Sequence, residues 1–378
     1  MPCLDEADTL EKCIVKTQRA LREHQITGEI IVADNGSHDG SQAIAERMGA
    51  RVVKVAERGY GNALMAGIEA AQGQFITIGD ADDSYDFSEL PKFVARFREG
   101  FELVQGCRLP RGGGRIVSGA MPFLHRWLGN PLLTMLARSW FKTREVHDIY
   151  CGMRGFTKKL YLRLNLRCTG MEFATEMIIK ACLYKAHITE VPITFHPDGR
   201  VSHPPHLRTF RDGWRTLWFF LIYSPRHTFL IPGGVLILLG LIGYGLALPG
   251  VSLGGITFEM QTLLFSSLFI LSGYQSLQFA LFTKTLAVSE GLLPEDPRVR
   301  RFLGLVNLEK ALVAGLITLM AGVALLIVSV FQWKEAAFGR LNYNSTMRWL
   351  IPGSALCTLG FQTVLGSFFV GILGLRRR

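Results

Sequence analysis

The C-terminal part of the sequence contains four long segments without Asp, Glu, Lys or Arg. They span residues 228–258, 260–283, 311–333 and 349–375. A helix needs about 20 apolar residues to cross the hydrocarbon core of a bilayer, and each segment reaches that length. Buried helices of a water-soluble protein are the alternative, but four such runs in one region are not typical of a soluble core. We therefore expect four transmembrane helices, at about residues 229–248, 259–283, 311–333 and 349–375.

Basic residues beside these segments predict how the chain lies in the membrane. Most of them stand before the first segment, between the second and third, and at the C-terminus: Arg208, Arg211, Arg215, Arg226, Lys284, Arg298, Arg300, Arg301, Lys310, Arg376, Arg377 and Arg378. The opposite side carries only Lys334, Arg340 and Arg348. The positive-inside rule then predicts a cytoplasmic N-terminal domain and a cytoplasmic C-terminus. The net charge of +10 comes from an excess of Lys and Arg beside the membrane segments. Contact with anionic lipid headgroups explains this excess better than a nucleic-acid partner does.

Before residue 228, charged residues are frequent and helical patterns alternate with strand patterns. Helices are predicted at residues 10–21, 42–48 and 63–71, and strands at 29–33, 51–55 and 74–78. Such alternation favours an α/β fold with a doubly wound, mostly parallel sheet. The opening residues look like the end of a strand, so we expect either a shortened first strand or a misassigned start site. The predicted layout is a cytoplasmic domain at 1–206, a juxtamembrane interfacial helix at 207–228 and a transmembrane domain at 229–378.

A pair of carboxylates follows the third predicted strand. Residues 75–84 read Phe-Ile-Thr-Ile-Gly-Asp-Ala-Asp-Asp-Ser, which places Asp80 and Asp82 just after the apolar run. Open α/β sheets bind ligands at the carboxyl ends of their strands. Hard oxygen ligands there suit Mg²⁺ or Mn²⁺, completed by phosphate oxygens. We expect a cation at Asp80 and Asp82 that neutralises a nucleoside diphosphate as it leaves a sugar.

A polar turn follows the first of the three predicted strands. Residues 34–41 read Asp-Asn-Gly-Ser-His-Asp-Gly-Ser, and the glycines allow the backbone to turn at the edge of the sheet. Asp34 is therefore a candidate acceptor of hydrogen bonds from a base or a ribose. The alternative is that this turn serves as a helix N-cap, made by Ser37 or Asp39.

Two further segments combine arginine with apolar or aromatic residues. Residues 208–227 include Trp214, Trp218 and Tyr223, a composition that fits an interfacial helix or a simple linker helix. Earlier in the chain, four arginines stand near the apolar residues of 121–136: Arg108, Arg111, Arg115 and Arg126. They indicate either a membrane-facing acceptor site or a basic patch that touches lipid headgroups.

Taken together, these segments resemble family 2 glycosyltransferases, in particular polyprenyl-phosphate glycosyltransferases such as dolichol-phosphate mannose and glucose synthases. The resemblance covers most of the chain and rests on the order of several short motifs: Pro2-Cys3-Leu4-Asp5-Glu6, residues 34–41, Arg58-Gly59-Tyr60-Gly61-Asn62-Ala63, Asp80-Ala81-Asp82, Gln105-Gly106-Cys107-Arg108, Cys151-Gly152-Met153-Arg154, and Gly170-Met171-Glu172-Phe173 with Glu176. Asn35 and Asp5 depart from the family pattern, which has Asp and Asn at these positions. Residues 195–205 resemble the family's Arg-x-x-Gly-x-Ser-Lys loop only loosely.

The resemblance implies a GT-A-like fold and a nucleotide-sugar donor. The residues it places against the donor are Pro2, Asp5, Glu6, Asp34, Asp80 and Arg200. It identifies Asp80-Ala81-Asp82 as the metal-binding motif, with Asp82 also at the catalytic centre. Arg200 would brace the phosphates, since an arginine fork fits phosphate geometry. The alternative for Arg200 is a solvated loop residue.

The resemblance also implies a polyprenyl-phosphate acceptor, bound by Arg108, Arg126 and Asn130. A lipid phosphate is already largely ionised near neutral pH, so no strong general base is needed. Its direct attack on the anomeric carbon would invert configuration, and the protein would mainly position and stabilise charge. Catalytic assignments are Asp82 and Arg108, with Asp148 and Glu172 as auxiliary carboxylates. Asp148 and Glu172 could equally pair with a neighbouring arginine.

Two other readings of the sequence stay open. The same fold could glycosylate another lipid, such as a diacylglycerol, or a growing polysaccharide. The Gln-x-x-Arg-Trp motif of processive polymer synthases does not occur at residues 208–215, which counts against a polymerase. A non-catalytic membrane scaffold or transport protein is the further alternative, and the intact Asp80 and Asp82 argue against it. The sugar, the base of the donor and the oligomeric state are left open by the sequence.

Overall fold

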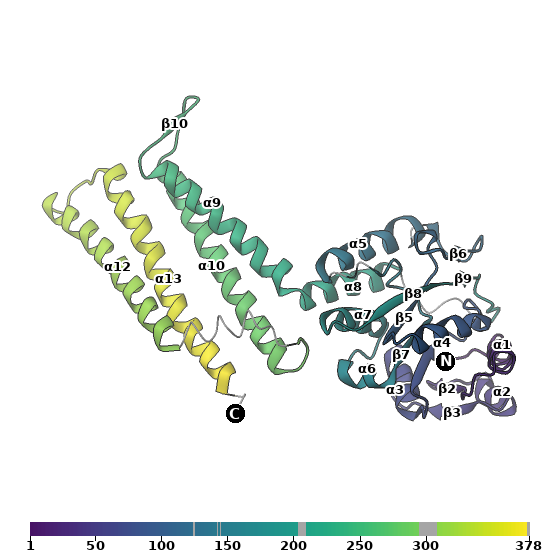
Figure 1. Cartoon of the computed structure of the whole chain (residues 1–378). Coiled ribbons are helices and arrows are strands. Elements are labelled where there is room, and N and C mark those ends of the chain that lie inside the picture. The colour runs from purple at the N-terminus through teal and green to yellow at the C-terminus, as the bar shows by residue number, and fades with distance from the viewer. Residues whose placement is uncertain (124, 142, 144, 203–208, 295–307, 376–378) are drawn as a thin grey trace. The chain divides into compact units, whose positions relative to one another are not determined.

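The computed structural model describes residues 1–123, 125–141, 143, 145–202, 209–294 and 308–375 (Figure 1). Several arginines on which the predicted membrane topology rests lie outside these ranges, namely Arg208, Arg298, Arg300, Arg301 and Arg376 to Arg378. So does part of the 195–205 loop. The chain divides into two compact units, residues 1–223 and 224–378.

The N-terminal part of the first unit is a parallel sheet with helices between its strands. The strands are β1 (Pro2–Cys3), β2 (Ile31–Asp34) and β3 (Arg51–Lys54), in the order β1-β2-β3. In register, Cys3 pairs with Asp34, which in turn pairs with Lys54. The intervening helices are α1 (Leu10–Glu23), α2 (Ser41–Arg47) and α3 (Tyr60–Ala70). The strand and helix alternation predicted for this region is confirmed.

A second, mixed sheet completes the first unit. Its order is β4 (Phe75–Ile78), β7 (Arg154–Thr157), β5 (Leu103–Cys107) and β8 (Ile188–Pro192). β7 runs antiparallel to both β4 and β5, whereas β5 and β8 are parallel. β6 (Arg115–Ile116) and β9 (Thr194–Phe195) form a short parallel pair. The pairing is therefore mostly parallel, as predicted, with one reversed strand inside the second sheet.

Helices flank the second sheet. They are η1 (Phe87–Glu89), α4 (Leu90–Arg98), η2 (Pro110–Gly112), η3 (His125–Gly129), α5 (Asn130–Phe141), α6 (Lys158–Leu164), α7 (Phe173–Leu183) and α8 (Thr209–Tyr223). Phe93 and Phe97 of α4 pack with Val104 and Met153 in one buried cluster. α8 lies against α5 (Figure 1), with the rings of Phe141 and Phe220 at 5.7 Å between centroids. These contacts make α8 part of the first unit.

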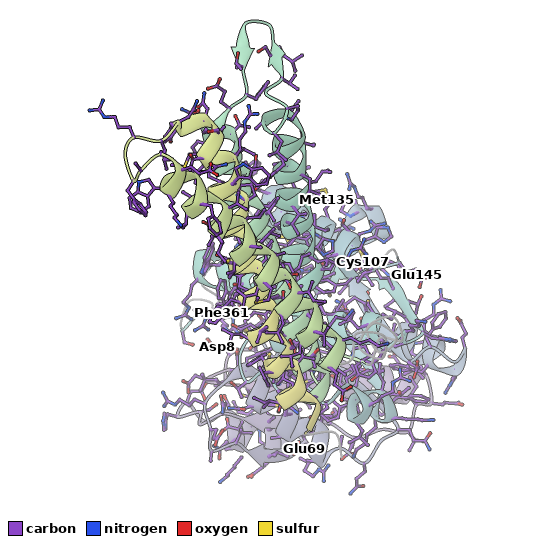
Figure 2. The ribbon with its side chains drawn as sticks, turned by 90° about the vertical axis from the view of Figure 1, so that its left-hand side faces the viewer. Asp8, Glu69, Cys107, Met135, Glu145 and Phe361 are labelled. Carbon is purple, nitrogen blue, oxygen red and sulfur yellow. The ribbon has the colours of Figure 1, made fainter. Side chains whose placement is uncertain are left out.

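The second unit consists mainly of long apolar helices. They are η4 (Arg226–Leu230), α9 (Ile231–Ala247), α10 (Met260–Ser289), α12 (Leu308–Glu335) and α13 (Tyr343–Leu375), with a hairpin of β10 (Ser252–Leu253) and β11 (Ile256–Thr257). The described residues contain four helices long and apolar enough to cross a membrane: Arg226–Ala247, Met260–Ser289, Glu309–Glu335 and Tyr343–Leu373. Exposed apolar side chains such as Phe361 cover their surfaces (Figure 2). Four long apolar helices are therefore present where the sequence predicts four spans.

Glycines allow α12 and α13 to approach each other closely. A Cβ added at Gly360 would lie 2.4 Å from the backbone nitrogen of Leu319. Such a distance is too short for any side chain, and the obstructing atom belongs to the backbone. In membranes the hydrophobic effect does not drive helices together, because lipid tails are as apolar as the side chains. Helix association there depends on close packing, which small residues such as glycine permit.

We expect Gly360→Leu to destabilise the membrane unit by about 1–3 kcal/mol or more, because the two backbones must separate. The check is the melting temperature of the full chain in detergent. Gly245→Leu is the matched control, since a Cβ there meets nothing within 4 Å. Equal melting temperatures for the two variants would contradict the packing described.

Candidate active site

Asp80 and Asp82 lie in the loop that leaves the carboxyl end of β4, and one oxygen of each is held by a neighbour. The Tyr60 hydroxyl donates to Asp80 Oδ1 at 2.8 Å. The backbone N–H and the hydroxyl of Ser84 donate to Asp82 Oδ1 at 3.0 and 2.6 Å. Burial of the carboxylate, followed by the charge of Asp82, raises the pKa of Asp80 to about 6. The negative charge of two neighbouring carboxylates is thus concentrated at this buried position.

The residues fit a divalent cation. A Cβ at residue 152 would stand 2.7 Å from Asp80 Oδ2, so Gly152 keeps the space in front of that oxygen clear. Among the described residues, no group of three or more His, Cys, Asp or Glu side chains is placed to hold a metal ion. A cation at Asp80 and Asp82 would therefore take its other ligands from water or from a diphosphate, which is the usual coordination of Mg²⁺.

Arg200 reaches this carboxylate pair from the far end of the first unit's sequence. Its Nη1 lies 3.5 Å from Asp82 Oδ2, and it donates to Asp198 Oδ2 at 2.7 Å. Its Nε and Nη2 form a two-pronged ion pair with Glu6, with Nε 2.8 Å from Oε2. The Arg200 side chain is only 9% exposed, so it is not a solvated loop residue. The structure brings together Glu6, Asp82 and Arg200 as the sequence predicts, with the guanidinium already bound by carboxylates.

The polar turn after β2 interlocks with the segment after β1. Asp34 Oδ2 accepts hydrogen bonds from the Gly36 and Ser37 N–H groups and from Gln42 Nε2, the last at 2.7 Å. Asp5 Oδ1 accepts from the His38 N–H at 2.8 Å. Asp34 is buried, so its described contacts organise the turn itself.

Asp39 supplies the capping contact at this turn. Its Oδ1 accepts a hydrogen bond from the Ser41 N–H at 3.0 Å, at the first residue of α2. The N-cap residue of α2 is nevertheless Gly40, so the predicted N-cap by Ser37 or Asp39 is wrong, and Asp39 contacts the first residue of the helix from outside the cap position. Pro2 lies beside the turn, since it pairs with Ala33 of β2.

Asn35 uses both ends of its side-chain amide to hold the segment before α3. Its Oδ1 accepts from the Gly59 N–H at 2.7 Å, and its Nδ2 donates to the Glu57 carbonyl at 2.8 Å and to the Val55 carbonyl at 3.4 Å. A carboxylate could accept the first bond but could not donate the others. This gives a physical reason for Asn at a position where the family resemblance has Asp.

We expect Asn35→Asp to lower the free energy of unfolding by about 1–3 kcal/mol, because two carbonyls would then face a carboxylate. The melting temperature of the full chain tests this. Asn62→Asp is a suitable control: Asn62 Nδ2 also donates to the Glu57 carbonyl, but at 3.5 Å and exposed to solvent. A loss no larger for Asn35→Asp than for Asn62→Asp would refute the role given to Asn35.

Arg108 and Asp148 form a buried ion pair. Arg108 Nε and Nη2 donate to the two oxygens of Asp148 at 2.7 and 2.9 Å, and the Arg108 N–H donates to Oδ2 at 3.1 Å. The Asp148 side chain is 0% exposed. Arg108 Nη1 also lies 3.4 Å from the Tyr85 hydroxyl, which accepts a hydrogen bond from the Gly152 N–H at 2.8 Å. Tyr85 thus connects the ion pair to the glycine beside Asp80.

Arg126 and Asn130 stand apart on η3 and α5. The Arg126 guanidinium lies over the ring of Trp127, 5.5 Å from its centroid. Asn130 Nδ2 contacts the Met121 sulfur at 3.5 Å. The apolar side chains around them project into solvent: Phe123, Trp127, Leu128, Leu132 and Met135, the last labelled in Figure 2. Trp214, Trp218 and Ile222 of α8 are exposed in the same way.

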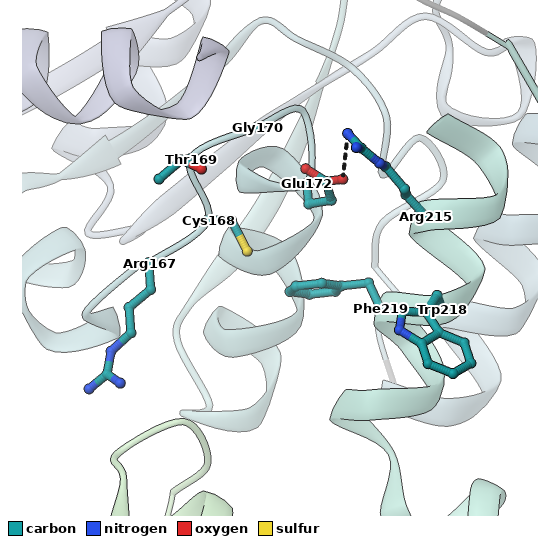
Figure 3. A pocket seen from close by; sticks show the side chains of 8 residues that line it. All are labelled: Arg167, Cys168, Thr169, Gly170, Glu172, Arg215, Trp218 and Phe219. Carbon is teal, nitrogen blue, oxygen red and sulfur yellow. Dashed lines mark ion pairs between the residues drawn. The ribbon is translucent and has the colours of Figure 1, made fainter. Parts of the chain in front are cut away.

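Glu172 lies just before α7, in a pocket of about 320 Å³ between the 167–172 loop and α8 (Figure 3). Its Oε1 is 3.7 Å from Arg215 Nη1. The ring of Phe219 forms the floor of the pocket, and the Cys168 side chain points toward that ring. Both proposed auxiliary carboxylates, Asp148 and Glu172, are thus paired with an arginine, the alternative that the sequence left open.

Sequence reasoning missed the two tyrosines that surround Asp80. Tyr60 stands between the two glycines of the Gly-Tyr-Gly motif at the start of α3. Tyr85 follows the carboxylate motif by three residues and is buried against Phe195. Nothing in the local sequence distinguishes these hydroxyls from other core tyrosines, because their partners are distant in the chain.

The alternating strands and helices, with carboxylates at a strand end, define a GT-A-like fold. A family model described as glycosyl transferase family 2 matches residues 1–164. A second, described as glycosyltransferase family 2 C-terminal transmembrane region, matches residues 281–374.

Relatives match the chain over different lengths. The low-salt glycan biosynthesis hexosyltransferase Agl6 of Haloferax volcanii is 35% identical over 376 residues, which are 99% of this chain and 88% of that protein. A dolichyl-phosphate hexose transferase of the same organism is 33% identical over 166 residues, 44% of this chain and 69% of that protein. The chain belongs to glycosyltransferase family 2. It is therefore a glycosyltransferase and an integral membrane protein.

Among solved structures, glucosyl-3-phosphoglycerate synthase from Mycobacterium tuberculosis in complex with Mn²⁺, UDP and glucosyl-3-phosphoglycerate is similar in fold. It is 22% identical, and the match covers 58% of this chain and 77% of that chain with a TM-score of 0.45.

Proposed function

We propose that this enzyme transfers a sugar, with inversion, from a nucleoside diphosphate to a polyprenyl phosphate at the cytoplasmic face of the membrane. The observation that carries the proposal is the carboxylate pair at the end of β4, with Asp80 Oδ2 facing the space left by Gly152 and Arg200 beside Asp82. A divalent cation, Mg²⁺ or Mn²⁺, held by Asp80 and Asp82 would supply positive charge to the departing diphosphate.

The protein's own residues then bind and orient the donor. The segments that carry Pro2, Asp5 and Asp34 contact each other at the carboxyl ends of β1 and β2. They would form one side of the donor-binding site. Arg200 is held by Glu6 and Asp198, and a diphosphate would compete with these carboxylates for its guanidinium. An arginine fork suits such a phosphate bidentately. On donor binding, the diphosphate would replace Glu6 or Asp198 as a partner of the Arg200 guanidinium.

A lipid phosphate is the acceptor that best fits the outer surface of the first unit. Arg126 and Asn130 lie among the exposed apolar residues of η3 and α5, and α8 exposes two tryptophans near two arginines. Aromatic and basic residues together are typical of a helix at the bilayer interface. A relative bearing the name dolichyl-phosphate hexose transferase supports the same class of acceptor.

Arg108 and Asp148 enter the proposal as a pair. Arg108 would meet the acceptor phosphate only by exchanging one of its bonds to Asp148, whose carboxylate would then stay beside the reacting groups. The lipid phosphate brings its own negative charge, so no strong base is required. Attack by its oxygen on the anomeric carbon breaks the bond to the diphosphate, and the main tasks of the protein are positioning and charge stabilisation.

A donor panel tests this function. Purified full chain is incubated with UDP- and GDP-sugars, and with either a short polyprenyl phosphate, a diacylglycerol or no acceptor. The expected product, identified by mass, is a polyprenyl-phosphate hexose formed from one donor class. Glycosylated diacylglycerol would support the second acceptor class instead, and no product with any donor would favour a non-catalytic role.

A further inference from the structure

The hydroxyl of Tyr60 fixes the orientation of Asp80, and no role of this kind follows from the family motif around it. The bond from Tyr60 to Asp80 Oδ1 is 2.8 Å long and leaves Oδ2 directed toward the space beside Gly152. Groups that orient a metal-binding carboxylate matter because they decide which oxygen faces the cation. The position of Tyr60 is in turn set by the first turn of α3.

That first turn rests on the backbone of a distant loop, residues 165–170. The Thr169 carbonyl accepts hydrogen bonds from the N–H groups of Gly61, at 2.8 Å, and Asn62, at 3.3 Å. A Cβ at Gly61 would lie 2.2 Å from the Cys168 carbonyl oxygen, and one at Gly59 would lie 2.4 Å from the Thr169 oxygen. Only glycines permit this contact, so the loop decides where Tyr60 stands.

Glu176 holds the loop in place. Its side chain is 0% exposed, and its Oε2 accepts hydrogen bonds from the N–H groups of Arg167 and Cys168, both at 2.9 Å. Its Oε1 lies 2.8 Å from Lys180 Nζ, which also donates to the Asn165 carbonyl at 2.8 Å. Burial alone would raise the pKa of Glu176, but the bonds from Lys180 and the loop lower it, so the group is a stable anion.

The same carboxylate is bonded to the last residue of α8. The Tyr223 hydroxyl donates to Glu176 Oε1 at 3.0 Å, and Tyr223 is buried. Arg215 of α8 also forms an ion pair with Glu172, which lies two residues after the 165–170 loop (Figure 3). An unbroken series of bonds therefore runs from Tyr223 through Glu176, the 165–170 loop and Tyr60 to Asp80.

We propose that Tyr60 is a positioning residue for Asp80, and that Glu176 and Tyr223 position Tyr60 through the 165–170 loop. The inference rests on the proposed metal-dependent function. It adds that the orientation of the Asp80 carboxylate depends on the position of α8. A change in the position of α8 would then change cation binding at Asp80 within the same folded unit.

The test is Mn²⁺ binding to the full chain in the presence of UDP, read from the electron paramagnetic resonance signal of free Mn²⁺. Tyr60→Phe keeps the ring and should weaken Mn²⁺ binding about 10-fold, the effect typical of groups that orient a metal ligand. Tyr223→Phe should weaken it about 3-fold, as expected for one hydrogen bond acting at a distance. The KM for the acceptor should stay unchanged in both.

Tyr244→Phe is the matched control. Its hydroxyl makes a 2.6 Å hydrogen bond to Ser267 Oγ inside the second unit, away from this series of bonds. It should lower the melting temperature much as Tyr223→Phe does while leaving Mn²⁺ binding intact. Wild-type affinity in Tyr60→Phe, or equal affinities for the Tyr223 and Tyr244 variants, would overturn the inference. No Mn²⁺ binding by the wild type would instead overturn the proposed metal dependence.

Discussion

Replacing Asp80 and Asp82 together by asparagine is expected to lower the rate of sugar transfer by about 10³-fold or more, since a cation's stabilisation of the leaving group is worth several kcal/mol. Asparagine keeps the size of each side chain and one acceptor oxygen. The bonds from Tyr60 and Ser84 can therefore persist while the negative charge is lost. The measurement is the initial rate of transfer by purified full-length protein at saturating donor.

Asp83→Asn is the control for this loss. Asp83 is the next residue in the same loop and is paired with Lys16 at 2.7 Å. Its positive φ of 61° is adopted by asparagine as readily as by aspartate. Its transfer rate should stay within about threefold of wild type, because a partly exposed ion pair contributes little. Full activity in the Asp80 and Asp82 double variant would show that these carboxylates are not the metal site.

Replacing Asp148 by alanine is expected to destabilise the protein by about 3–5 kcal/mol, because the buried Arg108 charge would lose its partner. Loss of activity in this variant alone would not separate catalysis from folding. The melting temperature of the full chain gives the stability effect. Glu11→Ala removes the exposed ion pair with Arg47 and should cost less than about 1 kcal/mol.

Combining Arg108→Met with Asp148→Ala separates the two roles. Removal of both charges should restore at least half of the lost stability, since a buried ion pair is often no better than apolar contacts of similar volume. If sugar transfer stays low although the stability of the double variant is restored, Arg108 and Asp148 take part in acceptor binding or chemistry as proposed. Restored transfer would assign the pair to structure alone and remove Arg108 and Asp148 from the active site.

Much of the fold was predictable because its signals are local. The strand at 75–78 and the helix at 10–23 follow from apolar periodicity within a few residues, and the four spans follow from length and the lack of charge. β7 could not be predicted, since its antiparallel place between β4 and β5 depends on pairing with residues 49 to 82 positions away in sequence.

The candidate site likewise contains residues that the sequence predicts and contacts that only the folded chain shows. Asp80, Asp82 and Glu6 could be proposed because they occur in recognisable motifs, whereas Arg200 stands in a loop with only a loose family resemblance. The structure does bring Glu6, Asp82 and Arg200 together. The partners of the buried charges could not be read from sequence. Asp148 is 40 residues from Arg108, and Glu176 is 47 residues from Tyr223, so only the folded chain shows which charge each carboxylate meets.

One comparison tests the central claim most directly. Purified full chain is given a radiolabelled nucleotide sugar with Mn²⁺ and either a polyprenyl phosphate or the corresponding polyprenol, and the label extracted into organic solvent is counted. We expect label in the organic phase with the phosphate only, and its disappearance on addition of EDTA. Equal transfer to the polyprenol, or transfer that persists with all divalent cations chelated, would contradict the account.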